Sequence, residues 1–271
     1  MEYVALFFKI LFFTLGIPVL CGLVVGVCDV IVNFLMGRGL GRGIILGTSI
    51  IGTPIHELGH ALMSLIFAHK IDKIVLWQPR SKDGTLGYVT HRYNRKNIYH
   101  QLGNIFIGLG PVFSGLAVMI LCMLIAFPET VSAYADNASS LVSGGDGYLS
   151  LLAEGFAIIP AMLEEWSDGG IPIWGRVIAV IFMLCVSLHI SLSPADIKGA
   201  LGGIPVYLSL TLIATVIVSL IGSAAMETVS GALAGFSAAT FALFMLVLVF
   251  AVLQILLGIL IFLIRKLIGL R

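Results

Sequence analysis

Charged residues are scarce in this chain. Lys, Arg, Asp and Glu make up 11% of its 271 residues, whereas a soluble domain carries about 25%. The net charge is only +1, so no basic excess favours a nucleic-acid partner. Cysteine is also rare, and each cysteine falls in an apolar stretch, which indicates small buried residues and argues against a disulfide framework. The cysteines are Cys21, Cys28, Cys122 and Cys185.

The chain contains several long apolar runs. Hydrophobic residues make up 59% of the chain, and the mean hydropathy is +1.10. Because a spanning helix needs about 20 apolar residues, the pattern predicts an α-helical polytopic membrane protein with about six transmembrane helices. The predicted spans are approximately 4–36, 43–69, 101–126, 171–192, 204–223 and 237–264.

Two of these spans contain residues that disturb helices. The first is overlong and carries Gly16-Ile17-Pro18, so we expect it to be broken or tilted. Its start lacks the basic residues of a cleavable signal, and we expect it to be retained. In the second span Thr53 suits a helix cap and Pro54 a first helical turn, so a new helical segment or a kink is expected there.

The connecting segments differ in the sign of their charge. Segment 70–100 and the tail after residue 264 carry Lys and Arg, whereas segment 127–170 has neither and is acidic. The positive-inside rule therefore places 70–100 and both termini in the cytosol and 127–170 outside a membrane, which we expect to be a bacterial cell membrane. Arg38 and Arg42 fall outside in this arrangement and count against it.

Two segments are predicted to be something other than spans. Ile71–Trp77 and Thr85–Thr90 have the composition of strands, and Ser81–Gly84 that of a turn, so we expect a small cytosolic β-hairpin. Segment 150–163 is apolar but short and contains Pro160, which favours an interfacial or re-entrant helix.

The most informative feature of the chain is His56-Glu57-Leu58-Gly59-His60. On a helix, positions i and i+4 share a face, so His56 and His60 can bind one zinc ion. Glu57 is then placed to take a proton from an attacking water, as in hydrolytic metallopeptidases. Ionisable side chains inside an apolar span usually have a function, so the pattern predicts a zinc-dependent hydrolase.

A catalytic zinc usually has three protein ligands, and Asp196 is the candidate for the third. It follows the fourth span near the cytosolic end, at a depth compatible with His60. Asp196 could instead cap the helix after Pro194 or pair with Lys198. His189, two helical turns earlier, could support the site, replace a ligand, or be a hydrogen-bonded residue of the helix bundle. His91 and His100 are nearer to the motif but belong to the hairpin region.

Over roughly residues 43–200 the chain resembles the site-2 protease family of intramembrane zinc metallopeptidases. His56–His60 matches the first motif of that family. Gly110-Pro111-Val112-Phe113-Ser114 is similar to its Gly-Pro-x-x-Asn motif, with Ser114 in place of Asn. Pro194-Ala195-Asp196 is similar to the end of its Asn-x-x-Pro…Asp-Gly motif.

This resemblance implies a set of site residues. The hairpin resembles the membrane-associated strands of the family, whereas Ile197 departs from the family pattern by following the aspartate where a glycine is usual. The implied zinc ligands are His56, His60 and Asp196, and the implied general base is Glu57.

The predicted function is that of an intramembrane zinc endopeptidase, which cuts a membrane protein in or near a transmembrane segment on the cytosolic side. The substrate helix must unwind, and an edge strand of the hairpin could hold it by strand addition. Asn104 and Ser114 in the third span could donate hydrogen bonds to the substrate. We expect a single membrane-embedded domain over 1–271, with a zinc protease core (43–200), the hairpin (70–100), an extracytoplasmic segment (127–170) and C-terminal helices (204–271).

The main alternative is a catalytically inactive family member that acts as a scaffold for membrane proteins. A membrane-embedded hydrolase of soluble or lipid-linked peptides and a zinc transporter are weaker alternatives. The expected partners are a membrane-protein or peptide substrate and the lipid bilayer, and a regulatory membrane protein would fit the same scheme.

Overall fold

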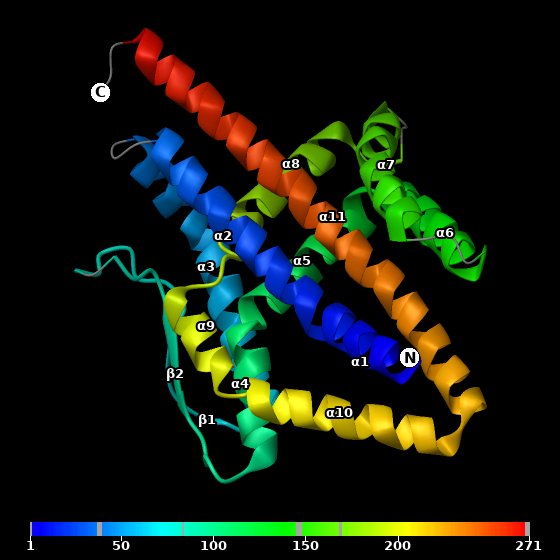
Figure 1. Ribbon diagram of the computed structural model, residues 1–271. Coiled ribbons are helices and arrows are strands. Elements are labelled where there is room, and N and C mark those ends of the chain that lie inside the picture. Colours follow the sequence, from blue (N-terminus) through cyan, green and yellow to red (C-terminus); the bar gives the residue numbers. More distant parts are fainter. Residues whose placement is uncertain (1, 37–39, 83, 145–147, 168–169, 269–271) are drawn as a thin grey trace.

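Helices make up nearly all of the structure, a computed structural model that describes residues 2–36, 40–82, 84–144, 148–167 and 170–268 (Figure 1). The strands of the described residues form one two-stranded antiparallel hairpin. The predicted helical fold and the hairpin are therefore confirmed.

The helices fall into two halves along the chain. The first half contains α1 (Glu2–Leu11), the π-helical turn η1 (Phe12–Gly16), α2 (Ile17–Met36), α3 (Leu40–Ile66), α4 (Ile98–Gly108) and α5 (Gly110–Ala126). The second half contains α6 (Pro128–Gly144), α7 (Tyr148–Ser167), α8 (Ile173–Ser187), α9 (Pro194–Leu201), α10 (Ile204–Ile221) and α11 (Ser223–Leu267).

Three helices of the described residues are long and apolar enough to cross a membrane. They are the run Tyr3–Leu35, α10 and α11, and α4 with α5 makes a fourth if that pair, bent by 55°, is one span. The six predicted spans are thus not confirmed. The polar residues of the His-Glu-x-x-His motif lower the mean hydropathy of α3, and α8 has only 15 residues.

Gly16-Ile17-Pro18 and Thr53-Pro54 affect their helices differently. The first span is interrupted by η1, which ends just before Ile17 and Pro18. Pro18 has no N–H to donate, and a π-helical turn absorbs such a local irregularity without ending the helix. In contrast, α3 continues through Pro54 as a single helix, and the Thr53 hydroxyl has no hydrogen-bond partner among the described residues. The expectation of a new helix at this point is wrong.

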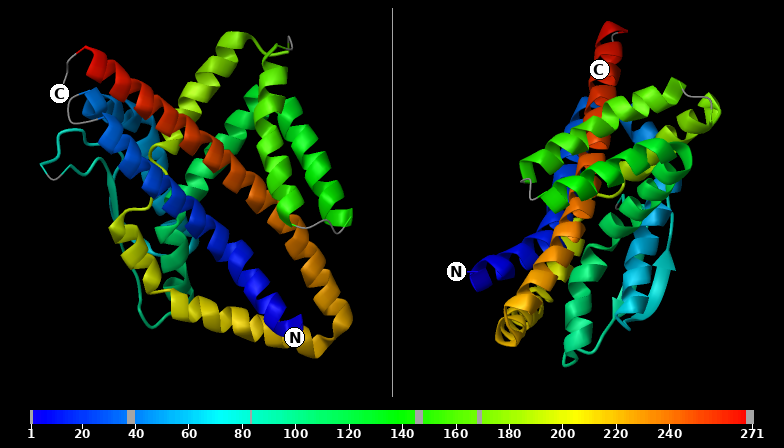
Figure 2. Two further views of the ribbon diagram at one scale, coloured as in Figure 1. Left: turned by 45° about the horizontal axis from the view of Figure 1, so that its top comes forward. Right: turned by 90° about the vertical axis from the view of Figure 1, so that its right-hand side faces the viewer.

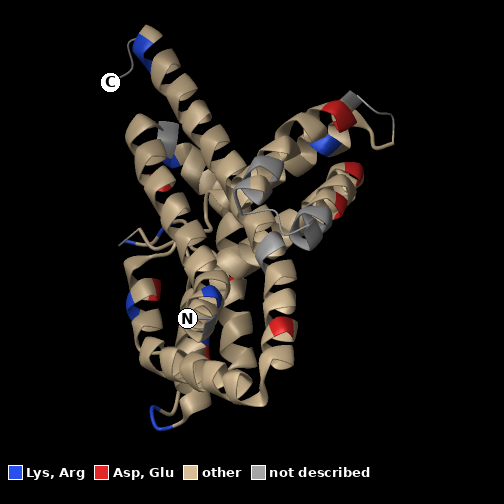
Figure 3. Ribbon diagram, turned by 45° about the vertical axis from the view of Figure 1, so that its right-hand side comes forward, with Lys and Arg blue, Asp and Glu red and all other residues tan. Residues whose placement is uncertain are grey.

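The main core lies between α2, α5, α8 and α11. Fully buried side chains from each of these helices meet there, among them Val25, Met119, Met183 and Phe250. In two views α2 and α11 run side by side (Figures 1 and 2). Figure 3 shows how few Lys, Arg, Asp and Glu residues interrupt the long helices. Many large apolar side chains of α10 and α11 are exposed, which is compatible with a membrane protein.

A helical pair, α6 and α7, occupies most of the segment predicted to be extracytoplasmic. The short helix predicted at 150–163 is part of α7, which has 20 residues and continues through Pro160. A buried Glu165 on α7 accepts hydrogen bonds from the backbone N–H and hydroxyl of Thr130 on α6, at 2.8 and 2.7 Å. Its carboxylate also lies 3.6 Å from Arg176 of α8, so one buried ion pair ties three helices together.

The hairpin consists of β1 (Lys70–Val75) and β2 (Tyr88–Arg92). Ile71 pairs with His91 and Val75 with Tyr88, and one register irregularity lies between Ile71 and Lys73. The strands are shorter than the predicted segments, but Gln78 N–H still donates to Leu86 O at 2.6 Å beyond them. Trp77 Nε1 donates to Ser49 Oγ of α3 at 2.9 Å, which anchors this end of the hairpin to the motif helix.

Helices α3 and α5 make a close contact through two glycines. A Cβ atom built on Gly59 would collide with Gly110 O and Ser114 Oγ, and one built on Gly110 would lie 2.7 Å from the Gly59 carbonyl group. Pro111 occupies the first turn of α5 and so supports the bend at Leu109 between α4 and α5. The second family-like motif therefore brings α5 against the His-Glu-x-x-His helix.

Replacement of Gly59 by Ala tests this close contact. We expect Gly59→Ala to lower the free energy of unfolding by about 1–3 kcal/mol, because the added methyl group meets backbone atoms that cannot move independently. Gly47→Ala on the same helix is the matched control, since a Cβ there has no atom within 4 Å. That variant should be neutral or slightly stabilising. Thermal unfolding of both variants in one detergent compares them, and equal melting temperatures would contradict the contact.

Candidate metal centre

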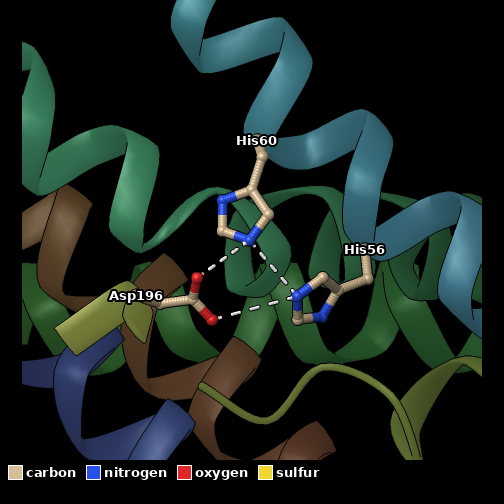
Figure 4. A group of neighbouring side chains, drawn as sticks. All are labelled: His56, His60 and Asp196. Carbon is tan, nitrogen blue, oxygen red and sulfur yellow. Dashed lines mark hydrogen bonds and ion pairs between the residues drawn. The ribbon is translucent and has the colours of Figure 1, made fainter. Parts of the chain in front are cut away.

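The two motif histidines point the same way from α3 because they lie one helical turn apart. His56 Nδ1 and His60 Nδ1 each donate to a backbone carbonyl, that of His189 and that of Ile107, both at 2.7 Å. In the neutral rings these bonds place the proton on Nδ1 and leave a lone pair on each Nε2. The two Nε2 atoms are 3.2 Å apart (Figure 4).

Asp196 completes the group from α9. Its Oδ1 lies 3.2 Å from His60 Nε2, and its Oδ2 lies 4.0 Å from His56 Nε2. Ser193 and Asp196 also form a capping box at the start of α9, with Asp196 Oδ2 accepting from Ser193 N–H at 2.8 Å. The aspartate therefore caps its helix, as one alternative proposed, while also facing the histidines.

The charge state of Asp196 follows from these contacts. Burial raises the pKa of the Asp196 carboxyl, but the contacts with His60 and Ser193 outweigh burial and hold this pKa below its usual range. The group is therefore a carboxylate at neutral pH and brings a negative charge to the site.

The donor set of this group fits a metal ion. The ligand atoms of His56, His60 and Asp196 all lie within 4.8 Å of one another. With both ring protons directed at carbonyl groups, the two Nε2 atoms and the Asp196 carboxylate can each offer a lone pair to a cation. Ring N–H groups held by backbone carbonyls are also the usual second contact of metal-binding histidines. The group could thus hold a metal ion.

Glu57 lies beside this group on α3 and lines the same cavity. Its side chain is buried, and its Oε2 has no hydrogen-bond partner in the described part of the chain. Gly87, just before β2, packs directly on it, since a Cβ at Gly87 would lie 2.8 Å from Glu57 Cγ. A buried carboxylate with an unsatisfied oxygen is suited to accepting a proton from a molecule that enters the site.

A cavity of about 640 Å³ opens over the three residues and Glu57. Its walls come from α3, α4, α9 and the hairpin. The residues that line it are His56, Glu57, His60, Thr85, Gly87, Tyr88, Val89, His91, Asn104, Ile107, Gly108, Ser193, Pro194, Ala195, Asp196 and Gly199. A volume of this size accommodates a short peptide segment or a small ligand.

The two predicted substrate-binding residues lie in different places. Asn104 is a buried residue of α4 that lines the cavity, and its Nδ2 has no hydrogen-bond partner among the described residues. Ser114 lies outside the cavity lining and donates to Ile55 O of α3 at 2.8 Å. In the structure, Ser114 therefore connects α5 to the motif helix. A substrate contact by Asn104 stays a prediction.

His189 meets the site through its backbone. Its carbonyl oxygen holds His56, whereas its own Nδ1 is bonded to Cys185 O at 3.0 Å. A Cβ at Gly52 would lie 2.5 Å from that ring, so the imidazole is packed tightly between α8 and α3. The structure therefore gives His189 a supporting position, bonded within the helix bundle.

The hairpin contributes residues that the sequence analysis did not select. Val89 and His91 line the cavity from β2, and Gly87 covers Glu57. The signal was present in part, because Val89 and His91 are two positions apart on one strand and so share a face, whereas Gly87 precedes β2 and Tyr88 lines the cavity as well. What the sequence could not show is which face of the hairpin turns toward α3.

Comparisons with protein-family models, with curated proteins and with solved structures find no match to this chain.

Proposed function

We propose that this protein is a zinc endopeptidase that cuts membrane proteins in or near a transmembrane segment. One observation carries the proposal: His56, His60 and Asp196 converge at a cavity that also contains the unsatisfied carboxylate of Glu57. Two imidazoles and one carboxylate form a common donor set for catalytic zinc, which keeps a further position open. The resemblance of the motifs to site-2 proteases points to the same chemistry.

Each group of residues at the site would have its own chemical role. A zinc ion held by the three ligands would supply a Lewis acid and a water that is deprotonated near neutral pH. Glu57 accepts the proton of the attacking water and passes it to the leaving amine. The carbonyl groups of His189 and Ile107 keep the imidazoles in their binding orientation.

The hairpin would present the substrate to this site. A helical segment hides its peptide bonds in intrahelical hydrogen bonds, so it must be extended before cleavage. The hairpin is a sheet of two strands, and β2 lines the cavity, so its edge away from β1 can accept an added strand. Asn104 would contribute a hydrogen-bond donor from α4.

The surroundings of the protein are part of the same proposal. The apolar helices would place it in a membrane as a multi-pass protein, with the hairpin and both termini on the cytosolic side. Its partners would be a membrane-protein substrate and the bilayer.

The metal content of the purified protein tests the first half of this proposal. We expect close to one zinc ion per chain in the wild type and only a small residual amount in Asp196→Ala, measured by elemental analysis in detergent. Ser193→Ala is the matched control, since it removes the capping box and keeps the carboxylate. That variant should retain its zinc.

Other outcomes would redirect the proposal. Unchanged zinc in Asp196→Ala would remove Asp196 from the ligands and point to His189. A wild type that is correctly folded by circular dichroism and binds no zinc would overturn the hydrolase and favour a scaffold.

A further inference from the structure

Three histidines meet where the hairpin contacts α3 and α4. His69 is buried in the turn between α3 and β1, His91 lies on β2 and His100 lies in the first turn of α4. The centroid of the His69 ring lies 5.0 Å from that of His91 and 5.4 Å from that of His100. The His69 ring also stacks on the Tyr93 ring, with 4.7 Å between their centroids. None of these rings belongs to the metal group described above.

The hydrogen bonds of this cluster determine where its protons lie. His69 Nε2 is 2.9 Å from His100 O, and because a carbonyl can only accept, His69 carries its proton on Nε2. In neutral His69 the Nδ1 atom is then a lone pair. His91 Nδ1 lies 3.0 Å from it, so His91 donates from Nδ1 and keeps a lone pair on Nε2. The Nε2 atom of His91 has no hydrogen-bond partner in the described part of the chain.

The strand geometry turns His91 toward the metal centre. His91 and Val89 lie two positions apart on β2 and so share a strand face, and both line the cavity together with Gly87, which precedes β2 and packs on Glu57. The cavity thus contains a hydrogen-bond acceptor on β2 and, on α4, the donor that Asn104 provides.

We propose that His91 is a substrate-binding residue whose Nε2 accepts a hydrogen bond from a peptide N–H in the cavity, and that His69 is a positioning residue that holds this tautomer. The inference rests on the proposed peptidase function, because a peptide is the ligand that brings an N–H group beside the metal. Backbone contacts of an added strand would align the substrate, whereas His91 would select the register in which an amide lies beside the site.

Two small probes separate this contact from metal binding. A dipeptide hydroxamate chelates zinc and also brings peptide N–H groups, whereas acetohydroxamate brings only the chelating group. We expect His91→Leu to bind the dipeptide hydroxamate about two- to tenfold more weakly and acetohydroxamate equally well, with its zinc content unchanged. Calorimetric titration of the zinc-loaded protein in detergent measures both affinities.

Matched variants define the role of each histidine. His91→Gln keeps an acceptor oxygen and should recover part of the affinity. His69→Leu should lose affinity like His91→Leu, and His69→Gln, which has both a donor and an acceptor, should restore part of it. His100→Ala is the control, because His100 contributes its backbone carbonyl, and its affinity for both probes should equal that of the wild type.

Three other results would overturn the role of His91, the proposed function, or both. Equal affinity of His91→Leu and the wild type for the dipeptide hydroxamate would overturn the role of His91 and leave the peptidase intact. Loss of zinc in His91→Leu would show that His91 has a structural role, and would also overturn its role in substrate binding. A zinc-loaded wild type that binds neither probe would instead overturn the proposed function and, with it, this inference.

Discussion

Replacement of Glu57 by Gln should slow peptide-bond cleavage by about 10²- to 10⁴-fold and leave the zinc content unchanged. The amide has nearly the same shape as the carboxylate but cannot accept a proton. Glu57 is buried at the cavity, and its Oε2 has no hydrogen-bond partner among the described residues, so the substitution breaks no hydrogen bond of that atom with them. A loss of turnover with intact metal binding would thus report on proton transfer.

The measurement uses a pool of single-span membrane proteins reconstituted with the enzyme in vesicles, with the products identified by mass spectrometry. Glu227→Gln is the matched control, because it makes the same change at an exposed carboxylate of α11. That variant should cleave at the wild-type rate. Equal cleavage by Glu57→Gln and the wild type would refute the role of Glu57. No cleavage by any variant, with zinc present, would favour the scaffold.

Replacement of Arg176 by Met should lower the free energy of unfolding by about 3–5 kcal/mol, because it leaves the buried Glu165 carboxylate without its counter-charge. Arg176 also donates to backbone carbonyls: its Nε bonds to Ala126 O at 3.1 Å, and its Nη1 bonds to Glu165 O. Its guanidinium further lies 5.7 Å from the centroid of the Phe127 ring. One side chain therefore holds α8 to the connections that lead into and out of α6 and α7.

A double substitution separates charge from packing in this cluster. Arg176→Met combined with Glu165→Gln removes both charges and keeps an acceptor for Thr130, so it should be more stable than Arg176→Met alone. Arg95→Met at an exposed position should stay within about 0.5 kcal/mol of the wild type. Thermal unfolding in detergent compares the variants. A single variant as stable as the wild type would show that the ion pair contributes little.

The spans illustrate why hydropathy alone predicts the helices of this fold only in part. The predicted span 101–126 has the right length and composition, yet the chain bends by 55° at Leu109, before Pro111. The predicted span 43–69 corresponds to α3, whose polar residues face a cavity. A window average counts apolar residues but contains no information on which side chains face protein, lipid or a cavity.

The roles of the candidate site residues could likewise be predicted from the sequence only in part. His56 and His60 could be assigned from spacing, because an i, i+4 pair on a helix is a local property. The role of Ser114 could not, since its bond to Ile55 O depends on the approach of two helices through Gly59 and Gly110. The contribution of His91 was also hidden, because it depends on how the hairpin lies against α3.

The sequence by itself determined the features that arise from neighbouring residues: the apolar helices, the hairpin, and a histidine pair with an adjacent glutamate on one helix. Their periodicity and turn residues act over a few positions, so no tertiary contact is needed to predict them. Only the tertiary structure decided that Asp196 meets residues 140 and 136 positions earlier, that Gly87 covers Glu57, and that Arg176 pairs with Glu165. Such contacts depend on how the intervening helices pack, and close packing selects one arrangement among many with the same hydropathy.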